Sequence, residues 1–413
     1  MKNIFILMVL IIAYSSADQT IEIVKKIDKK PTIAIAGDSS NQLSRKLLKL
    51  IVGDLKVSGH FRVNENVKNI SYDASDIKPN EELLLKTKFS QDPSGRLSAK
   101  VKLLNAKNGN RFFEKSYAIS KGNRYPFLAH NIAIDINDYY KFPSIVWMRK
   151  YILFAKYTSS GKSSIYVADY TLSFKKKIVS GGLNIFPKWA DSSQKSFYYT
   201  SYNGRKPTLY KLDVYSGSKQ KIISSNGMVV CSDVSHDGSK LLITMAPKDQ
   251  PDIYLYDLNS GSKKRITTFR GIDVGGNFVD NDSGVVFVSD RLGYPNIFHK
   301  NINGGKVEQM VYHGKNNSSC TTYDKYIVYS SRESISGGGR STFNLYLIST
   351  QTDFIRRLTQ GGKNMFPRFA DDGETILFIK NSGGVSNLGI LRLNENRSFL
   401  FPLREGKIQS IDW

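Results

Sequence analysis

The sequence has little cysteine and little proline, and after residue 17 it has no apolar run near the length that crosses a membrane. Only two cysteines, Cys231 and Cys320, occur in 413 residues, so a disulfide-stapled scaffold is excluded. Twelve prolines against 32 glycines, with 12% aromatic residues, favour a globular, strand-rich chain over a disordered one. The length predicts at least two domains.

An apolar run occurs only at the very start of the sequence. A basic start, Met1-Lys2, precedes the apolar residues 4–13, and the small residues Ser15–Ala17 follow. This order is typical of a secretory signal peptide cleaved after Ala17, with an uncleaved anchor as the alternative. No cysteine follows the run, which disfavours a lipoprotein. We therefore expect an exported chain, a monomer, that is peripheral to membranes and does not span them.

Acidic residues are scarce. Thirty-six Asp and Glu residues stand against 59 Lys and Arg, which gives a formal charge of +23. Such a charge indicates either attraction to an anionic partner, such as lipid headgroups, cell wall or an acidic protein, or a lysine-rich solvated surface. Nucleic acid is not expected as a partner of an exported protein.

Catalytic and metal-binding motifs are missing from the sequence. There is no G-x-S-x-G, no HExxH and no CxxC, and the five histidines are scattered among unrelated segments. "GKSS" at Gly161 lacks the glycine that a phosphate loop requires five residues earlier, where Lys156 stands. We predict no catalytic, cofactor-binding or metal-binding residues, and no enzyme.

Two similar decapeptides lie far apart in the chain, "NIFPKWADSS" from Asn184 and "NMFPRFADDG" from Asn364. Between them a tyrosine or phenylalanine in a strand-like context recurs at steps of 44, 44, 44 and 48 residues, and a last step of 43 reaches Gly389. Periods of this length built from short strands indicate propeller blades. The positions of the series are Tyr166, Tyr210, Tyr254, Phe298, Tyr346 and Gly389.

The last residues complete this series. Trp413 falls 44 residues after Phe369, where a sixth inner strand is due, while the first repeat lacks an inner strand of its own. The C-terminal strand is therefore predicted to close the first blade, which leaves the ring without a free edge. The sequence predicts an all-β, six-bladed β-propeller closed by the C-terminal strand.

Residues before the propeller carry a different pattern. A strand, an apolar-periodic helix over Asn41–Gly59, three longer strands and a final helix indicate an α/β domain with one mixed sheet. The expected division is 1–17 signal peptide, 18–142 α/β domain with an N-terminal arm, and 143–413 propeller.

This layout resembles the TolB family, periplasmic propeller proteins of the Tol-Pal envelope system. Local matches carry the resemblance: "DLKVSGHF" from Asp54, "LAHNIAIDI" from Leu128 and "IYLYDLNSGSKKRITT" from Ile253. It implies a periplasmic, non-enzymatic adaptor that links a Pal-like peptidoglycan-associated lipoprotein to a TolA-like inner-membrane protein, in support of envelope integrity and of outer-membrane constriction during division.

The resemblance also implies where the partners bind. The Pal-like partner would contact propeller loops, at Met228, Val229, Val230, Cys231, Val274, Gly275 and Gly276. The TolA-like partner would engage the N-terminal arm, at Asp18, Gln19, Thr20, Ile21, Glu22, Ile23 and Val24. The alternative is a secreted propeller enzyme that acts on glycan or peptide in its central channel, for which carboxylates or histidines should converge on the inner strands.

Overall fold

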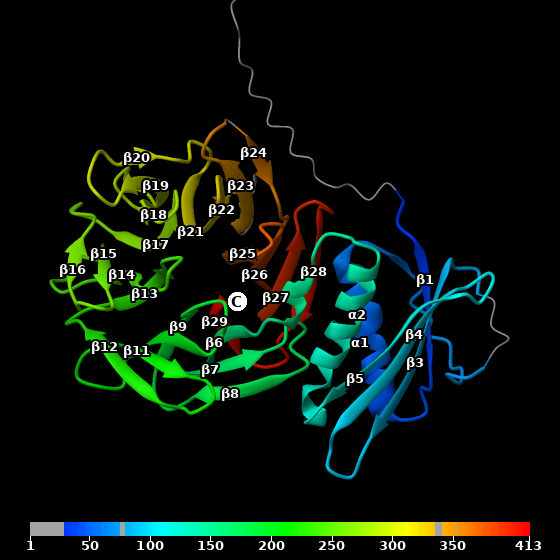
Figure 1. The fold of residues 1–413 in the computed structure, drawn as a ribbon. Helices are drawn as coiled ribbons and strands as arrows, with labels where there is room; N and C mark the ends of the chain where they lie inside the picture. The colour runs from blue at the N-terminus through cyan, green and yellow to red at the C-terminus, as the bar shows by residue number, and fades with distance from the viewer. Residues whose placement is uncertain (1–28, 75–78, 335–340, 353) are drawn as a thin grey trace, which may run out of the picture.

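The computed structural model describes residues 29–74, 79–334, 341–352 and 354–413. The predicted signal peptide and the arm residues Asp18–Val24 lie outside these ranges. The described chain forms an α/β part and a ring of β-sheets, as expected from the sequence (Figure 1).

The α/β part is a mixed five-stranded sheet in the order β2-β1-β3-β4-β5, in which β1 is parallel to both of its neighbours. Helices α1 and α2 pack against it, between the sheet and the propeller (Figure 1). The elements are β1 (Thr32–Gly37), α1 (Gln42–Ser58), β2 (Arg62–Val63), β3 (Leu83–Gln91), β4 (Leu97–Asn105), β5 (Arg111–Ile119), η1 (Gly122–Arg124) and α2 (Tyr125–Tyr139).

Helix α1 begins and ends where its sequence predicts. The side chain of Asn41 accepts a hydrogen bond from the Ser44 backbone N–H, which satisfies one of the free donors of the first turn. Gly59 ends the helix at φ 78°, a left-handed conformation that glycine adopts without steric cost. Leu47, Ile51 and Leu55 follow helical spacing and are fully buried against the sheet.

The second part consists of six four-stranded blades around a central channel. The short helix η2 (Val146–Arg149) precedes it, and the predicted boundary at residues 142–143, which lies between α2 and η2, stays a prediction. The first three blades are β29 (Lys407–Asp412) with β6 (Ile152–Ser159), β7 (Lys162–Ala168) and β8 (Lys175–Val179); β9 (Asn184–Trp189), β10 (Ser196–Ser201), β11 (Thr208–Asp213) and β12 (Lys219–Ser224); and β13 (Val229–Val234), β14 (Lys240–Met245), β15 (Asp252–Asp257) and β16 (Lys263–Arg265).

The other three blades continue the ring. They are β17 (Asp273–Val279), β18 (Gly284–Ser289), β19 (Asn296–Asn301) and β20 (Glu308–Gln309); β21 (Lys315–Tyr323), β22 (Tyr326–Glu333), β23 (Thr342–Ser349) and β24 (Ile355–Arg357); and β25 (Lys363–Phe369), β26 (Thr375–Ser382), β27 (Val385–Arg392) and β28 (Arg397–Pro402). A single pairing of Phe343 with Lys363 joins the last two blades into one sheet.

The C-terminal strand closes the ring as predicted. Strand β29 is the inner strand of the first blade and pairs antiparallel with β6. Its last residues lie at the centre of the ring, beside β6 and β9 (Figure 1). Because β29 and β6 come from opposite ends of the propeller sequence, their pairing ties the first blade to the sixth.

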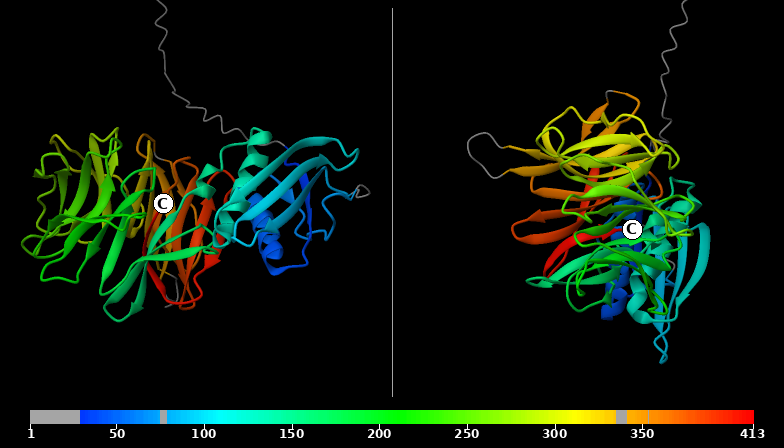
Figure 2. Two further views of the ribbon diagram at one scale, coloured as in Figure 1. Left: turned by 60° about the horizontal axis from the view of Figure 1, so that its bottom comes forward. Right: turned by 90° about the vertical axis from the view of Figure 1, so that its left-hand side faces the viewer.

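A buried polar cluster joins the α/β part to the first blade, and Figure 2 shows the two parts side by side. His130 on α2 places Nδ1 2.8 Å from Oδ2 of Asp54 on α1, and Nε2 3.4 Å from Oδ2 of Asp169, just after β7. The hydroxyl of Tyr170 donates to the same Asp54 carboxylate. Burial alone lowers the pKa of His130, but the two carboxylates outweigh it and raise the pKa to about 9.

Candidate functional site

The inner strands of all six blades are irregular where they enter the channel. Strands β9, β13, β17, β21, β25 and β29 each shift register against their neighbour at this point. Such β-bulges bend a strand and re-aim side chains, and they concentrate near binding sites. The bulges therefore mark this end of the channel, the channel mouth, as a specialised surface.

The two repeated decapeptides supply two of these bulges. Phe186 and Phe366 hold φ values of 52° and 54°, a left-handed conformation that is costly for a bulky residue. A serine on the inner strand of the preceding blade holds each of them. The Phe186 N–H donates to Ser410 Oγ at 3.1 Å, and the Phe366 N–H donates to Ser319 Oγ at 3.2 Å. The repeat is thus explained by one structural role, a strained bulge that presents an aromatic side chain at the mouth.

A cavity of about 320 Å³ opens at the mouth. Its wall is mostly apolar and draws on all six inner strands, so no single blade forms it. The volume lies at the lower end of the range for small-molecule pockets and suits an inserted side chain or short peptide segment. Its apolar wall residues include Phe186, Met228, Val230, Val274, Met365, Phe366 and Ile411.

The structure brings most of the predicted loop residues together in this wall. Met228, Val230, Cys231, Val274 and Gly275 all line the cavity. Val229 is fully buried in the core on the other side of β13, because alternate residues of a strand face opposite ways. Gly276 also faces a blade interior: a Cβ there would lie 3.2 Å from Ile253 and Val285 side-chain atoms.

Both cysteines lie in the same wall as free thiols. Each is 3% exposed. Burial raises the pKa of both thiols, that of Cys320 to about 12. Both thiols are therefore protonated at neutral pH and act as apolar wall residues.

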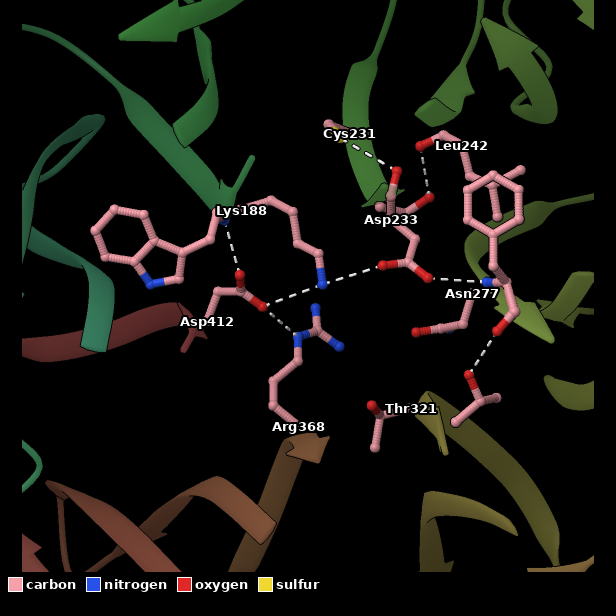
Figure 3. Close-up of polar contacts among 12 residues, drawn as sticks. Lys188, Cys231, Asp233, Leu242, Asn277, Thr321, Arg368 and Asp412 are labelled. Atoms are coloured by element: carbon pink, nitrogen blue, oxygen red, sulfur yellow. Dashed lines mark hydrogen bonds and ion pairs between the residues drawn. The ribbon is translucent and has the colours of Figure 1, made fainter. Parts of the chain in front are cut away.

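A ring of six polar residues crosses the channel below the cavity, one from each inner strand (Figure 3). The positions recur every 44 to 47 residues in the sequence. Each lies within the last three residues of its inner strand, just before the chain turns into the next strand. The ring, in blade order from the first blade, is Asp412, Lys188, Asp233, Asn277, Thr321 and Arg368.

Charges of opposite sign alternate along four neighbouring members of this ring, Arg368, Asp412, Lys188 and Asp233. Lys188 Nζ lies 3.1 Å from Asp233 Oδ1 and 3.3 Å from Asp412 Oδ1. Burial lowers the pKa of Lys188, but these two carboxylates outweigh it and raise the pKa. Arg368 Nε approaches Asp412 Oδ1 at 3.4 Å without hydrogen-bond geometry, so this contact is Coulombic.

Two ring carboxylates also join their blades to the next through the backbone. Asp412 accepts from the Trp189 N–H at 2.8 Å, and Asp233 accepts from the Phe278 N–H at 2.9 Å. Trp189 and Phe278 directly follow the ring residues Lys188 and Asn277 in the sequence. The ring was missed because its six positions carry five different residue types. The available signal was positional: a polar residue recurs at intervals of 44 to 47 residues, directly before Trp189, Val234, Phe278, Thr322, Phe369 and Trp413.

The ring separates the mouth cavity from a second, more polar one of about 810 Å³. Wall residues of the first come before the ring position in each inner strand, such as Phe186 and Met228. Wall residues of the second come after it, such as Ala190, His236 and Trp413. The two ends of the channel therefore offer different surfaces, one apolar and one polar.

The channel gathers few groups that could hold a metal ion. In the described ranges, no group of three or more His, Cys, Asp or Glu side chains has a metal-binding arrangement. The two ring carboxylates, Asp233 and Asp412, already accept backbone hydrogen bonds and pair with Lys188. Within the same ranges, no helix is both long and apolar enough to cross a bilayer. The arrangement is suited to contact by shape and apolar burial.

Comparisons with known proteins agree with this architecture. The family model described as "TolB beta propeller domain" matches residues 146–413, and that described as "TolB amino-terminal domain" matches residues 19–112. The crystal structure of TolB from Acinetobacter baumannii superposes with a TM-score of 0.74 at 19% identity, over 93% of this chain and 96% of that one. At this identity the likeness shows the fold alone.

Similar sequences extend over the full chain. The Tol-Pal system protein TolB of Wolinella succinogenes is 47% identical and that of Campylobacter jejuni strain RM1221 is 47% identical, covering 96% and 100% of both chains respectively. The Tol-Pal system protein TolB of Helicobacter pylori strain J99 is 40% identical over 100% of both chains. The chain therefore belongs to the TolB family of Tol-Pal system proteins.

Proposed function

We propose that the chain is a periplasmic, non-enzymatic adaptor that binds a Pal-like peptidoglycan-associated lipoprotein at the channel mouth and a TolA-like inner-membrane protein through its N-terminal arm. In this role it supports envelope integrity and outer-membrane constriction during cell division. It is exported by a signal peptide cleaved after Ala17, stays peripheral to membranes and acts as a monomer.

The observation that carries the proposal is the apolar cavity at the mouth. It exposes Met228 and Val274 in a wall built by several blades, above a ring in which the charges of Lys188 and Asp412 are paired. An apolar, pre-formed recess of this kind gains free energy from burying a partner's side chain. Gly275 and the strained Phe186 hold the rim in a fixed shape, which lowers the entropy cost of binding.

The arm residues Asp18–Val24 support the second half of the proposal by pattern alone. Polar and apolar residues alternate there, as in a strand that adds to a partner's sheet edge. The described chain begins at Lys29, three residues before β1 of the α/β part.

The alternative is a propeller enzyme that acts in the central channel, and the carboxylates of the channel ring are its candidate catalytic groups. Such an enzyme would need carboxylates free to exchange protons with a substrate. Asp233 and Asp412 do converge in the channel, but each pairs with Lys188 and accepts a backbone N–H from the next blade. These contacts hold both side chains in structural roles, which favours the adaptor.

The proposal is tested by recovery of envelope proteins. The mature chain from Asp18 is used as bait in a detergent-solubilised envelope, beside a Met228→Glu/Val274→Glu variant. We expect a peptidoglycan-associated lipoprotein with the unmodified bait and its loss with the variant, since both changes put unpaired charge into an apolar wall. Tyr215→Glu, on an exposed turn outside this wall, is the matched control. If the unmodified bait retrieves no envelope protein, the adaptor proposal is wrong.

A further inference from the structure

A separate cavity of about 510 Å³ lies between the second and third blades. The loop joining β10 to β11 and the connection from β12 to β13 form one wall, and β16 of the third blade supplies Lys263. None of the residues that line it lines the mouth cavity. The volume falls within the range of small-molecule sites.

Positive charge dominates this cavity. Arg205, Lys206, Lys221 and Lys263 line it, and no Asp or Glu among the described residues does so. None of the four forms an ion pair with a described residue, unlike Arg265 on the same β16, which pairs with Asp252. Four unpaired cations around one recess create a focused positive potential that attracts an anion.

The fold does not require cations at these positions. Residues 202–207, 246–251 and 290–295 form loops of the same length in consecutive blades, each ending in proline. Where the second blade has Arg205 and Lys206, the third has Asp249 and Gln250, and the fourth has Gly293 and Tyr294. Connections of this length therefore form with a cationic, an acidic or an uncharged pair, so the length of the loop does not itself require Arg205 and Lys206.

Hydrogen-bonding groups complete the wall. Ser225 is 4% exposed, and its hydroxyl has no hydrogen-bond partner in the described part of the chain. A buried hydroxyl without a partner costs free energy, which a ligand oxygen would recover. Ser224 and Asn226 flank it in the same wall and carry further donors. A recess with guanidinium, ammonium and hydroxyl donors suits an oxyanion with several acceptor oxygens.

We propose that this cavity is a phosphate-binding site, occupied by the phosphate of an anionic phospholipid headgroup or by free phosphate. Arg205 offers paired N–H donors to two phosphate oxygens, Lys206, Lys221 and Lys263 supply point charges, and Ser225 donates its hydroxyl. The volume exceeds what a single phosphate ion fills, so the site accommodates a phosphate that carries further polar atoms.

The site lies at the same end of the propeller as the channel mouth. Ser225 and Asn226 line the phosphate cavity, and Met228, two residues on, lines the mouth cavity. A bound phosphate would therefore orient the mouth relative to a membrane surface, if the lipid is the source. This inference stands on the cavity itself and does not depend on the proposed lipoprotein binding.

Two probes distinguish the sources of phosphate. Inorganic phosphate is titrated into the purified protein at low ionic strength by calorimetry, and vesicles of phosphatidylcholine with or without phosphatidylglycerol are tested by co-sedimentation. The test variant is Lys221→Gln/Lys263→Gln, and Ser225→Ala tests the hydroxyl. The control is Lys175→Gln/Lys177→Gln, which removes the same charge from two exposed positions on β8 of the first blade. Equal thermal unfolding of all variants establishes that folding is intact.

We expect the test variant to weaken phosphate binding on the order of tenfold or more, since two charge-assisted contacts are lost, while the control stays within about twofold. Phosphatidylglycerol-dependent sedimentation that the test variant alone abolishes identifies the lipid headgroup as the source; binding of phosphate without vesicle binding identifies the free ion. Failure of the unmodified protein to bind either probe overturns the proposal. An equal loss of binding in the control variant also overturns the proposal, because binding would then depend on the diffuse positive charge of the surface and not on this cavity.

Discussion

The carboxylate of Asp412, the second residue from the C-terminus of the described chain, accepts a hydrogen bond from the backbone N–H of Trp189 at 2.8 Å. The same carboxylate pairs with Lys188 and approaches Arg368. The C-terminal strand thus supplies both the inner edge of the first blade and one member of the channel ring. Closure of the propeller and organisation of the channel depend on the same few residues.

Removal of residues 407–413 should therefore destabilise the protein far more than seven residues of ordinary terminus would. The loss exposes the β6 edge, removes the Asp412 carboxylate and removes Trp413, whose indole N–H donates to the Phe369 carbonyl at 2.9 Å. We expect a large fall in melting temperature and aggregation on gel filtration. A truncated chain that stays monomeric with an unchanged melting temperature would contradict this closure.

Replacement of Asp412 by Asn isolates the ionic contribution. Asparagine keeps an oxygen that can accept the Trp189 N–H, but it lacks the negative charge that pairs with the largely buried Lys188. We expect a loss of unfolding free energy on the order of 3 kcal/mol, since one partner of a buried ion pair is removed. Urea denaturation measures it. Asp371→Asn, on an exposed carboxylate that pairs with Lys150 at 3.2 Å, should cost below about 1 kcal/mol.

The buried His130 should make stability fall with alkaline pH. Its pKa in the folded protein, about 9, lies above the ordinary value of 6.5, so the charged form is stabilised by folding. The contribution is complete below pH 6.5 and is lost as pH rises through about 9. Urea denaturation at pH 6.5, 8 and 9.5 should show a decline on the order of a few kcal/mol.

His130→Gln is the control for this pH dependence. It should be less stable at pH 6.5 but should lose most of the decline between pH 6.5 and 9.5. His60 does not interfere in this window, because burial lowers its pKa to about 4 and its effect falls on the acid side. A variant whose stability declines with pH as steeply as the unmodified protein would refute the role given to His130.

The strained bulge at Phe186 allows binding to be separated from folding. Phe186→Gly relieves a left-handed conformation, worth about 1–2 kcal/mol, which offsets part of the lost apolar contact. The N–H bond to Ser410 is kept. We expect a change in unfolding free energy within about 1 kcal/mol, but clearly weaker lipoprotein binding, because the aromatic wall is gone. Equal losses of stability and affinity would show that Phe186 acts through the fold.

The sequence predicts the fold well because the same local sequence pattern recurs in each blade. Alternating strands, Asp and Gly turns and a period near 44 residues are local signals, and they place Tyr166, Tyr210 and Tyr254 in equivalent strands. The closing strand follows from counting, since Trp413 falls where an inner strand is due. The caps of α1, Asn41 and Gly59, are likewise readable from residue type.

The details of the site are harder to predict, because they depend on the bulges. Alternation along β13 places Met228 and Val230 in the mouth wall and Val229 in a blade interior, and the bulges after Cys231 and Val274 then shift this alternation. Contacts between distant segments, such as His130 with Asp169, leave no local pattern either. Sequence reasoning found the loops of the mouth but not the direction of each side chain.

The central proposal is that the apolar mouth binds the lipoprotein, and a calorimetric titration tests it most directly. The purified periplasmic domain of the peptidoglycan-associated lipoprotein is titrated into the unmodified protein, Met228→Glu and the control Tyr215→Glu. The account predicts tight binding by the unmodified protein and the control, and an affinity lower by about a hundredfold for Met228→Glu, whose carboxylate would be buried without a partner. Equal affinity of Met228→Glu and the unmodified protein would contradict it.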